Sequence, residues 1–240
     1  MTDETTAPAA GKVDFRRTLD AYRARRGELR LVDVPPLQYL MIDGHGDPNT
    51  SPAFAEAVAA LYPLAYRIKF ASKADLGRDY AVMPLEGLWW ADDMDAFTVS
   101  RDKSRWRWTL MIMTPDWVDA GMVAAAAERV AAKAAPARLA DVRLATLDEG
   151  RCVQTLHVGS FDDEAGVLAQ IHHELVPAQG LRLTGRHHEI YLSDFRRVPP
   201  ERRRTILRQP VTDVVADDVP VGVPDDAPVG VPDDAPDDVA

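Results

Sequence analysis

The predicted order of strands and helices along the middle of the chain is the feature that most constrains the fold. A β-branched and aromatic run at 38–43 indicates a strand, and turn residues end it. Apolar residues at helical spacing then predict a helix over about 53–70. Two strand-like segments follow, at 80–90 and 106–114. The first half therefore has the order βαββ.

The second half of the chain is predicted to repeat this order. A connecting helix is expected over 119–135, ended by a proline. A strand at 151–158, a helix from 162 or 163 to about 179, and strands at 187–193 and 205–211 come next. Two βαββ units in one chain predict an α+β fold with pseudo-twofold symmetry around a concave groove in the sheet.

The two ends of the chain differ in composition from this central region. The sequence VGVPDDAP occurs at 221–228 and again at 229–236, and such proline- and aspartate-rich sequence cannot build a packed core. The chain is therefore divided into a disordered N-terminus at 1–11, a folded domain at 12–211 and a disordered acidic tail at 212–240.

Charge and cysteine content limit the possible functions. The formal net charge is −10, but removing the eleven acidic residues of segments 1–10 and 211–240 leaves about +1 for the rest, which does not favour nucleic-acid binding. Cys152 is the single cysteine, so no intramolecular disulfide can form. No signal peptide or membrane-length apolar stretch is seen. These features predict a cytoplasmic protein.

The strand at 187–193 carries an unusual set of polar side chains. Because side chains alternate along a strand, His187, Glu189, Tyr191 and Ser193 share one face. This face can be open to solvent, as the spacing alone favours, or it can line a cavity. In a cavity, desolvation would raise the pKa of Glu189 and make it a better base.

All five tryptophans lie in one stretch of about 30 residues, at 89, 90, 106, 108 and 117. Trp106 and Trp108 share a strand face, whereas Trp89 and Trp90 point to opposite faces. Large rigid rings bind flat aromatic or cationic ligands well, and they also fill protein cores. The pattern leaves these two interpretations equally open.

Several kinds of active site lack their required residues. The His187–Glu189 pattern has no downstream P-C-x-x-C, which excludes a zinc deaminase. His172 and His173 are adjacent, so one helix cannot direct both at one metal ion. The chain also has no P-loop and no G-x-S-x-G motif. No metal site and no cofactor are predicted.

Three runs of the sequence resemble the GyrI-like small-molecule-binding proteins. They are Leu40-Met-Ile-Asp-Gly-His-Gly-Asp-Pro-Asn49, Met83-Pro-Leu-Glu-Gly-Leu-Trp-Trp90 and His187-His-Glu-Ile-Tyr-Leu-Ser-Asp194. The resemblance covers about 12–211. It implies two βαββ repeats around a concave ligand groove, and a glutamate at 189 that meets cationic drugs. Some relatives sense drugs as transcription regulators, but no helix-turn-helix precedes this domain, so direct DNA binding is not expected.

One stand-alone branch, the cyclopropanoid cyclopropyl hydrolases, is more similar to this chain. It implies hydrolysis of the strained cyclopropane of DNA-alkylating agents such as yatakemycin, which gives resistance or detoxification. In this interpretation Glu189 activates water, and Tyr191 stabilises charge on the dienone oxygen. The ligand-binding residues would be Trp89, Trp90, Trp106, Trp108, Tyr66, Glu86 and His187.

Two other functions stay open beside hydrolysis. The protein could bind and sequester flat or cationic drugs without turnover, in which case it protects only stoichiometrically. It could also inhibit DNA gyrase by binding it, as the name of the family implies. The expected partner in the first two cases is a small drug-like molecule, with no membrane and no direct nucleic acid.

Overall fold

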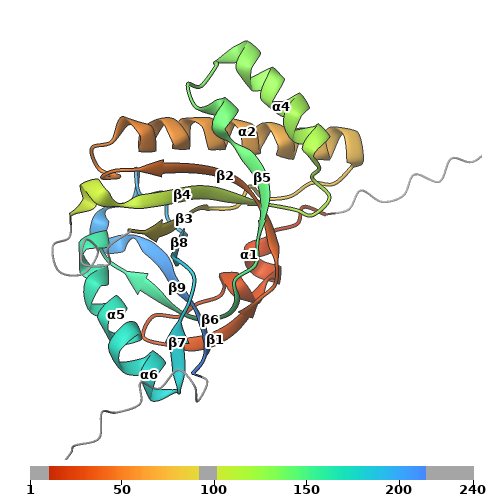
Figure 1. The fold of residues 1–240 in the computed structure, drawn as a ribbon. Helices are drawn as coiled ribbons and strands as arrows, with labels where there is room; N and C mark the ends of the chain where they lie inside the picture. The colour runs from red at the N-terminus through yellow and green to blue at the C-terminus, as the bar shows by residue number, and fades with distance from the viewer. Residues whose placement is uncertain (1–10, 92–101, 215–240) are drawn as a thin grey trace, which may run out of the picture.

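The computed structural model describes residues 11–91 and 102–214. Nearly all of the predicted N-terminal and C-terminal disordered segments therefore lie outside the described residues. The described chain is an α+β fold built on one curved antiparallel sheet with helices packed against it (Figure 1). This confirms the fold class predicted from the order of elements.

The first βαββ unit consists of β2 (Leu37–His45), α2 (Pro52–Leu76), β3 (Leu85–Trp90) and β4 (Arg107–Thr114). The helix is longer than predicted and ends at Gly77, whose positive φ of 67° favours glycine. Its apolar stripe is buried against the sheet, as the helical spacing predicts. β3 is shorter than predicted, because Tyr80 forms only an isolated bridge with Val13.

The second unit consists of β6 (Gly150–Val158), α5 (Glu164–Gln170), β8 (His187–Tyr191) and β9 (Arg204–Asp213). The helix of this unit is not continuous. It begins with a 3-10 turn at Phe161–Asp163, and α5 is followed by a π-helical turn at Ile171–Leu175 and by α6 (Val176–Ala178). β9 runs two residues beyond the predicted end, because β7 (Leu181–Leu183) pairs with it there.

The strand order shows the pseudo-twofold symmetry directly. It is β1-β6-β9-β8-β3-β4-β2-β5, so β8 and β3 meet in the middle and each half mirrors the other. The edge strands are exchanged between the halves. β1 (Arg30–Val34) precedes the first unit but pairs with β6 of the second, and β5 (Arg143–Leu147) precedes the second but pairs with β2 of the first. Each half thus completes the sheet of the other.

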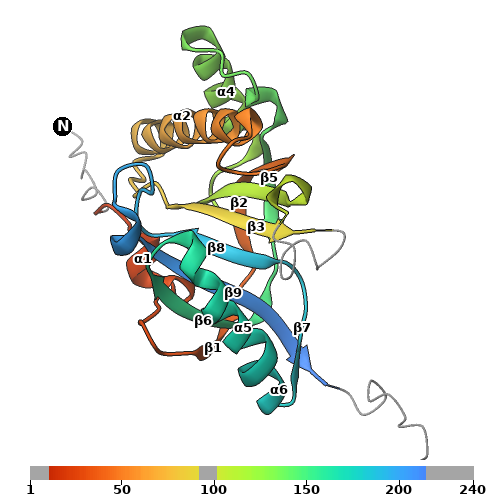
Figure 2. The same ribbon diagram turned by 90° about the vertical axis from the view of Figure 1, so that its left-hand side faces the viewer.

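Helices α2 and α5 cover the same face of the sheet, on either side of its central strands (Figures 1 and 2). Phe54 of α2 packs on Trp89 and Trp108, and the charge of Glu189 raises the pKa of the buried Glu164 at the start of α5. Trp89, Trp108 and Glu189 share one face of the sheet. We call this face the helix face. Helix α4 (Ala120–Lys133), which follows the first unit, packs against α2 (Figure 1).

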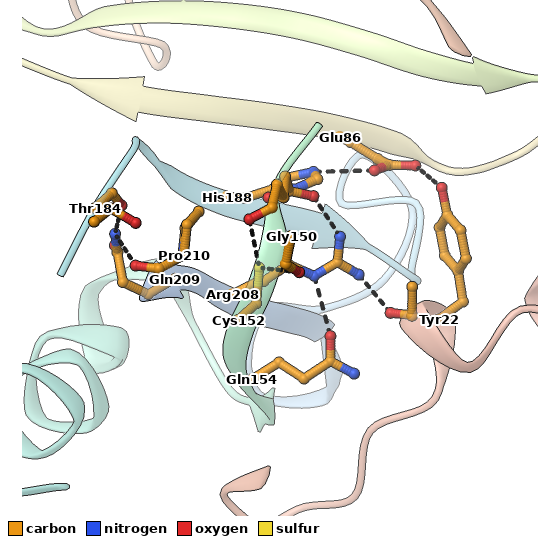
Figure 3. Close-up of polar contacts among 12 residues, drawn as sticks. Tyr22, Glu86, Gly150, Cys152, Gln154, Thr184, His188, Arg208, Gln209 and Pro210 are labelled. Atoms are coloured by element: carbon orange, nitrogen blue, oxygen red, sulfur yellow. Dashed lines mark hydrogen bonds and ion pairs between the residues drawn. The ribbon is translucent and has the colours of Figure 1, made fainter. Parts of the chain in front are cut away.

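The other face of the central strands carries a buried ionic network (Figure 3). We call it the network face. His188 contacts Glu86 at 3.0 Å through Nε2 and Glu149 at 2.9 Å through Nδ1. Arg208 donates to Glu149 at 2.8 Å, and Tyr22 of the N-terminal segment donates to Glu86 at 2.6 Å. The network therefore ties β3, β8 and β9, the β5–β6 turn and the N-terminal segment together.

The charges of this network balance one another. Burial alone raises the pKa of Glu149, but His188 and Arg208 outweigh it and lower that pKa to about 2. Burial alone lowers the pKa of His188, yet Glu149 and Glu86 outweigh it and raise that pKa. The positive charges of this network are on His188 and Arg208, and the carboxylates are those of Glu86 and Glu149. Their charges cancel, which explains how four such side chains can stay buried.

None of the helices in the described ranges is long and apolar enough to cross a membrane.

Candidate functional site

The candidate site lies on the helix face, where β3 and β8 pair in the middle of the sheet. Gly87 of β3 pairs with Glu189 of β8, and Trp89 pairs with His187. Because paired residues in an antiparallel sheet point to the same side, Glu189 lies beside the tryptophan ring. Because Gly87 has no side chain, the indole of Trp89 and the hydroxyl of Tyr191 can meet beside it.

A chain of hydrogen bonds fixes the carboxylate of Glu189. The indole Nε1 of Trp89 donates to the Tyr191 hydroxyl at 3.1 Å, and this hydroxyl donates to Oε2 of Glu189 at 2.7 Å. Burial and the adjacent Glu189 carboxylate raise the pKa of Tyr191 well above its ordinary value, so the hydroxyl keeps its proton. The side chain of Glu189 is 15% exposed.

A second carboxyl group, that of Glu164, stands next to Glu189. Glu164 opens α5 and is 3% exposed, and its Oε1 atom is buried without a hydrogen-bond partner in the described part of the chain. Burial and the charge of Glu189 raise the pKa of Glu164 well above its usual range. The sequence analysis missed this residue, since an acidic residue after Asp162 and Asp163 looks like an ordinary helix start.

A buried histidine, His187, and a half-buried one, His172, lie near Glu189. Nε2 of His187 lies 3.6 Å from Oε1 of Glu189, which is outside hydrogen-bond distance. His172, in the π-helical turn, is close enough to His187 that burial and this neighbour lower the pKa of His172 to about 4. Turns of this kind are frequent at functional sites. Within the described residues, no group of three or more metal-ligating side chains could hold a metal ion.

Aromatic rings pack around Trp89 and Tyr191, the two residues whose hydrogen bonds lead to Glu189. Phe54 stacks on Trp89 with ring centroids 6.2 Å apart, and Phe161 meets Tyr191 edge to face at 5.6 Å. Phe195, in the loop after β8, contacts the rings of Phe54, Phe161 and Tyr191. We call this set the aromatic cluster: Phe54, Trp89, Trp106, Trp108, Phe161, Tyr191 and Phe195. The three phenylalanines were not predicted, because they come from helix, turn and loop.

Two of the predicted tryptophans occupy different positions in this cluster. Trp106 meets the ring of Trp89 edge to face at 5.8 Å. Trp108 is fully buried and lies over Gly44, where an added Cβ would be 2.1 Å from the ring. Trp108 therefore forms the floor of the cluster, and a ligand could reach it only after other rings had moved.

Three of the predicted ligand-binding residues lie away from Glu189, and their assignment to this site is corrected here. Glu86 and Trp90 alternate with Trp89 and so point to the network face, where Glu86 is bound by Tyr22 and His188. Trp90 instead stacks under the guanidinium of Arg186, 3.5 Å from the ring centroid. Tyr66 is 50% exposed on α2 and pairs with Phe70.

Two surface hollows lie outside the aromatic cluster. One, of about 750 Å³, is lined by Trp90, Arg107 and neighbours on the network face. The other, of about 520 Å³, lies between the segment after Arg26, the strand at His157 and α5. Neither is lined by Glu189.

Replacing Gly87 with alanine should damage the site without changing the chemistry of any polar group. A Cβ there would lie 2.8 Å from Nε1 of Trp89 and 3.1 Å from the Tyr191 hydroxyl, so it would separate the two partners of their hydrogen bond. We expect a loss of about 1–3 kcal/mol in the free energy of unfolding, measured by urea denaturation, and weaker ligand binding.

Gly166→Ala in α5 is the matched control, because an added Cβ there meets nothing within 4 Å. Helix propensity predicts that this variant is unchanged or slightly more stable. Equal stability and equal ligand affinity of Gly87→Ala and the wild type would contradict the described packing.

Fold and site together define a class of protein: a domain of two βαββ units that encloses an aromatic, carboxylate-bearing site for small molecules. Residues 27–211 match the GyrI-like small molecule binding domain. The chain belongs to this family, as its sequence motifs predicted. It is a GyrI-like small-molecule-binding protein.

Solved structures similar to this chain include two proteins from Listeria innocua. An uncharacterized conserved protein is 37% identical, with a TM-score of 0.76, and the match covers 84% of this chain and 100% of that one. A hydrolase is 35% identical, with a TM-score of 0.73 and the same coverage. The EcmrR–DNA complex, at 12% identity, a TM-score of 0.50 and coverage of 78% of this chain and 58% of that one, shares the fold. No curated protein matches significantly.

Proposed function

We propose that the chain is a hydrolase that opens the activated cyclopropane of flat, hydrophobic DNA-alkylating agents of the yatakemycin type. The observation that carries the proposal is Glu189, a partly exposed carboxylate held by Tyr191 among stacked aromatic rings. Such a site combines a surface for a flat ligand with a base for water. Its effect in a cell would be resistance to the drug.

The Listeria innocua hydrolase supports an enzymatic role. It is 35% identical, and the match covers 84% of this chain and 100% of that one. The tryptophans support the ligand class, since a flat ring system stacks well on Trp89 and Phe54.

The proposed reaction needs only water and the residues of the site. The drug's ring system lies among the aromatic side chains, and a water molecule lies between Glu189 and the cyclopropane methylene carbon. The water oxygen bonds to that carbon while the cyclopropane C–C bond breaks. The electron pair of the broken C–C bond passes through the ring system to the dienone oxygen, which becomes a phenolate. One proton of the water goes to Glu189 and the other stays on the new hydroxyl group; the phenolate then takes a proton from solvent, and Glu189 returns its proton to solvent. The net change is addition of one water.

Tyr191 has a different role from the one expected in the sequence analysis. Its hydroxyl proton is donated to Glu189, so it is not free to stabilise the dienone oxygen. We assign Tyr191 as a positioning residue that aims the carboxylate, with Trp89 holding Tyr191 in turn. Much of the rate would then come from placing water and carbon in line.

The second candidate is sequestration of drugs without turnover. One observation favours it: Glu189 lines neither of the two surface hollows described above. A site that opens to take a drug and closes tightly around it would protect without chemistry.

A time course of yatakemycin with protein at one-tenth of the drug concentration separates the two candidates. A hydrolase clears all of the drug and gives a product heavier by one water. A sequestering protein binds one equivalent, quenches tryptophan fluorescence and leaves the remaining drug intact. That second result would overturn the proposed reaction.

A further inference from the structure

Buried polar atoms without hydrogen-bond partners gather near Glu189. In the described part of the chain, eight buried side-chain nitrogen or oxygen atoms have no partner, and four of these belong to Glu164, His172 and His187. Buried polar groups in folded proteins are nearly always hydrogen-bonded, so a group without a protein partner normally meets water or a ligand. This concentration indicates a polar subsite beside the aromatic cluster.

His187 gives the clearest evidence for this subsite. Its side chain is 9% exposed, and neither Nδ1 nor Nε2 has a hydrogen-bond partner among the described residues. It lies on the same face of β8 as Glu189 and pairs with Trp89 of β3. An unpaired buried polar group costs stability, and a phenylalanine would fill the position without that cost. The imidazole is therefore better explained by what it binds than by how it packs.

The spacing of His187 and Glu189 suits one oxygen atom that contacts both. Nε2 of His187 lies 3.6 Å from Oε1 of Glu189, which is too long for a direct hydrogen bond. An oxygen at about 2.8 Å from each atom completes a triangle with ordinary hydrogen-bond lengths. Oε2 of the same carboxylate already accepts from Tyr191 at 2.7 Å, so Oε1 is the oxygen that faces this position.

We propose that His187 and Glu189 together bind one oxygen atom, and that this oxygen is the water consumed in the proposed hydrolysis. His187 is then a catalytic residue that holds the water while Glu189 takes its proton. The inference deepens the proposed function and rests on it for the reaction. The binding of water at this position does not depend on turnover.

Each part of the water molecule has a defined fate in this step. One hydrogen is donated to Oε1 of Glu189 and is transferred there as the oxygen bonds to the cyclopropane carbon. Nε2 of His187 donates to the oxygen or accepts its second hydrogen, according to the tautomer of the ring, and in either case one lone pair remains for the carbon. The second hydrogen stays on the new hydroxyl group, so His187 neither gains nor loses a proton. Two fixed contacts orient the water for attack.

A high-resolution crystal structure of the ligand-free protein tests the water position without any drug. We expect an ordered water within about 3.2 Å of both Nε2 of His187 and Oε1 of Glu189. The same water should be missing or displaced in His187→Phe. A wild-type structure in which the imidazole is well ordered and no water contacts Nε2 would overturn the inference.

His187→Phe tests the role in catalysis, because it removes both nitrogens and keeps a ring. We expect its single-turnover rate with yatakemycin to fall by about 10–100-fold, with little change in the affinity measured by tryptophan fluorescence quenching. His187→Gln can again donate or accept and should recover part of the rate. The urea midpoint of His187→Phe should equal or exceed that of the wild type. A purely structural role would instead lower the midpoint and leave the rate unchanged.

His157→Phe is the matched control. His157 is a buried histidine on β6, but its Nε2 contacts the carbonyl oxygen of Ser160 at 3.0 Å. Phenylalanine would lose this contact, so the urea midpoint should fall while the single-turnover rate stays at the wild-type value.

Failure of the inference can be told apart from failure of the proposed function. Turnover by the wild type with an equal rate in a folded His187→Phe protein would overturn the inference and leave the hydrolysis standing. Intact drug with the wild type would overturn both the hydrolysis and the catalytic role of His187. A His187→Phe protein that does not fold would contradict the stability argument and overturn the inference.

Discussion

Arg208→Met is expected to lower the free energy of unfolding by about 3–5 kcal/mol. Arg208 is fully buried on the network face and donates to Glu149, Gln154 and the carbonyl oxygen of Ala21. Methionine preserves most of the volume but leaves the Glu149 carboxylate buried with only His188 as a charged partner. A buried charge that has lost a partner is among the most destabilising changes known in proteins. Urea denaturation of both proteins measures the difference.

Arg151→Met is the control for this experiment. Arg151 pairs with Asp213 at 2.9 Å, but both side chains are exposed. Its replacement should therefore lower the free energy of unfolding by only about 0–1 kcal/mol. Adding Glu149→Gln to Arg208→Met should restore part of the lost stability, because it removes the unpaired charge. If Arg208→Met and Arg151→Met lowered the free energy of unfolding by nearly equal amounts, the buried network would not be what holds the sheet together.

Glu189→Gln is expected to lower the turnover of a cyclopropane-bearing drug by about 10²–10⁴-fold while drug binding persists. Glutamine has the same shape and can still accept from Tyr191 through its amide oxygen, but it cannot take a proton from water. Single-turnover kinetics gives the chemical rate, and quenching of tryptophan fluorescence gives the affinity.

The control for this prediction is Glu174→Gln, which removes an exposed carboxylate from the π-helical turn and should leave both rate and affinity unchanged. A Glu189→Gln protein that binds the drug and retains the wild-type rate would remove Glu189 from the chemistry. Weaker binding at an unchanged chemical rate would make Glu189 a ligand-binding residue only.

The main architecture could be predicted because apolar periodicity is a local property of the sequence. The spacing of apolar residues from Phe54 to Ile68 predicts the helix α2. The run of β-branched and aromatic residues from Gln38 to Asp43 predicts the strand β2. The exchange of β1 and β5 between the two halves could not be predicted. Which strands pair at the edges depends on long-range contacts, and nothing in the local pattern of either strand reports its partner.

Strand alternation predicted part of the site for the same reason. It placed Glu189 and Tyr191 on one face of β8 and separated Trp89 from Trp90. It could not show that Glu86 is held by His188, because that contact joins two strands far apart in the sequence. Glu164 and Phe195 were missed because a helix start and a loop have no strand periodicity that would direct them to Glu189.

The location of the ligand is the central claim, and a crystal structure of Glu189→Gln with bound yatakemycin tests it most directly. We predict the drug between Phe54, Trp89 and Phe161, with its cyclopropane carbon one water molecule away from the side chain at 189. Drug bound instead in the hollow beside Trp90 and Arg107, with the aromatic cluster unmoved, would contradict the assignment of the site.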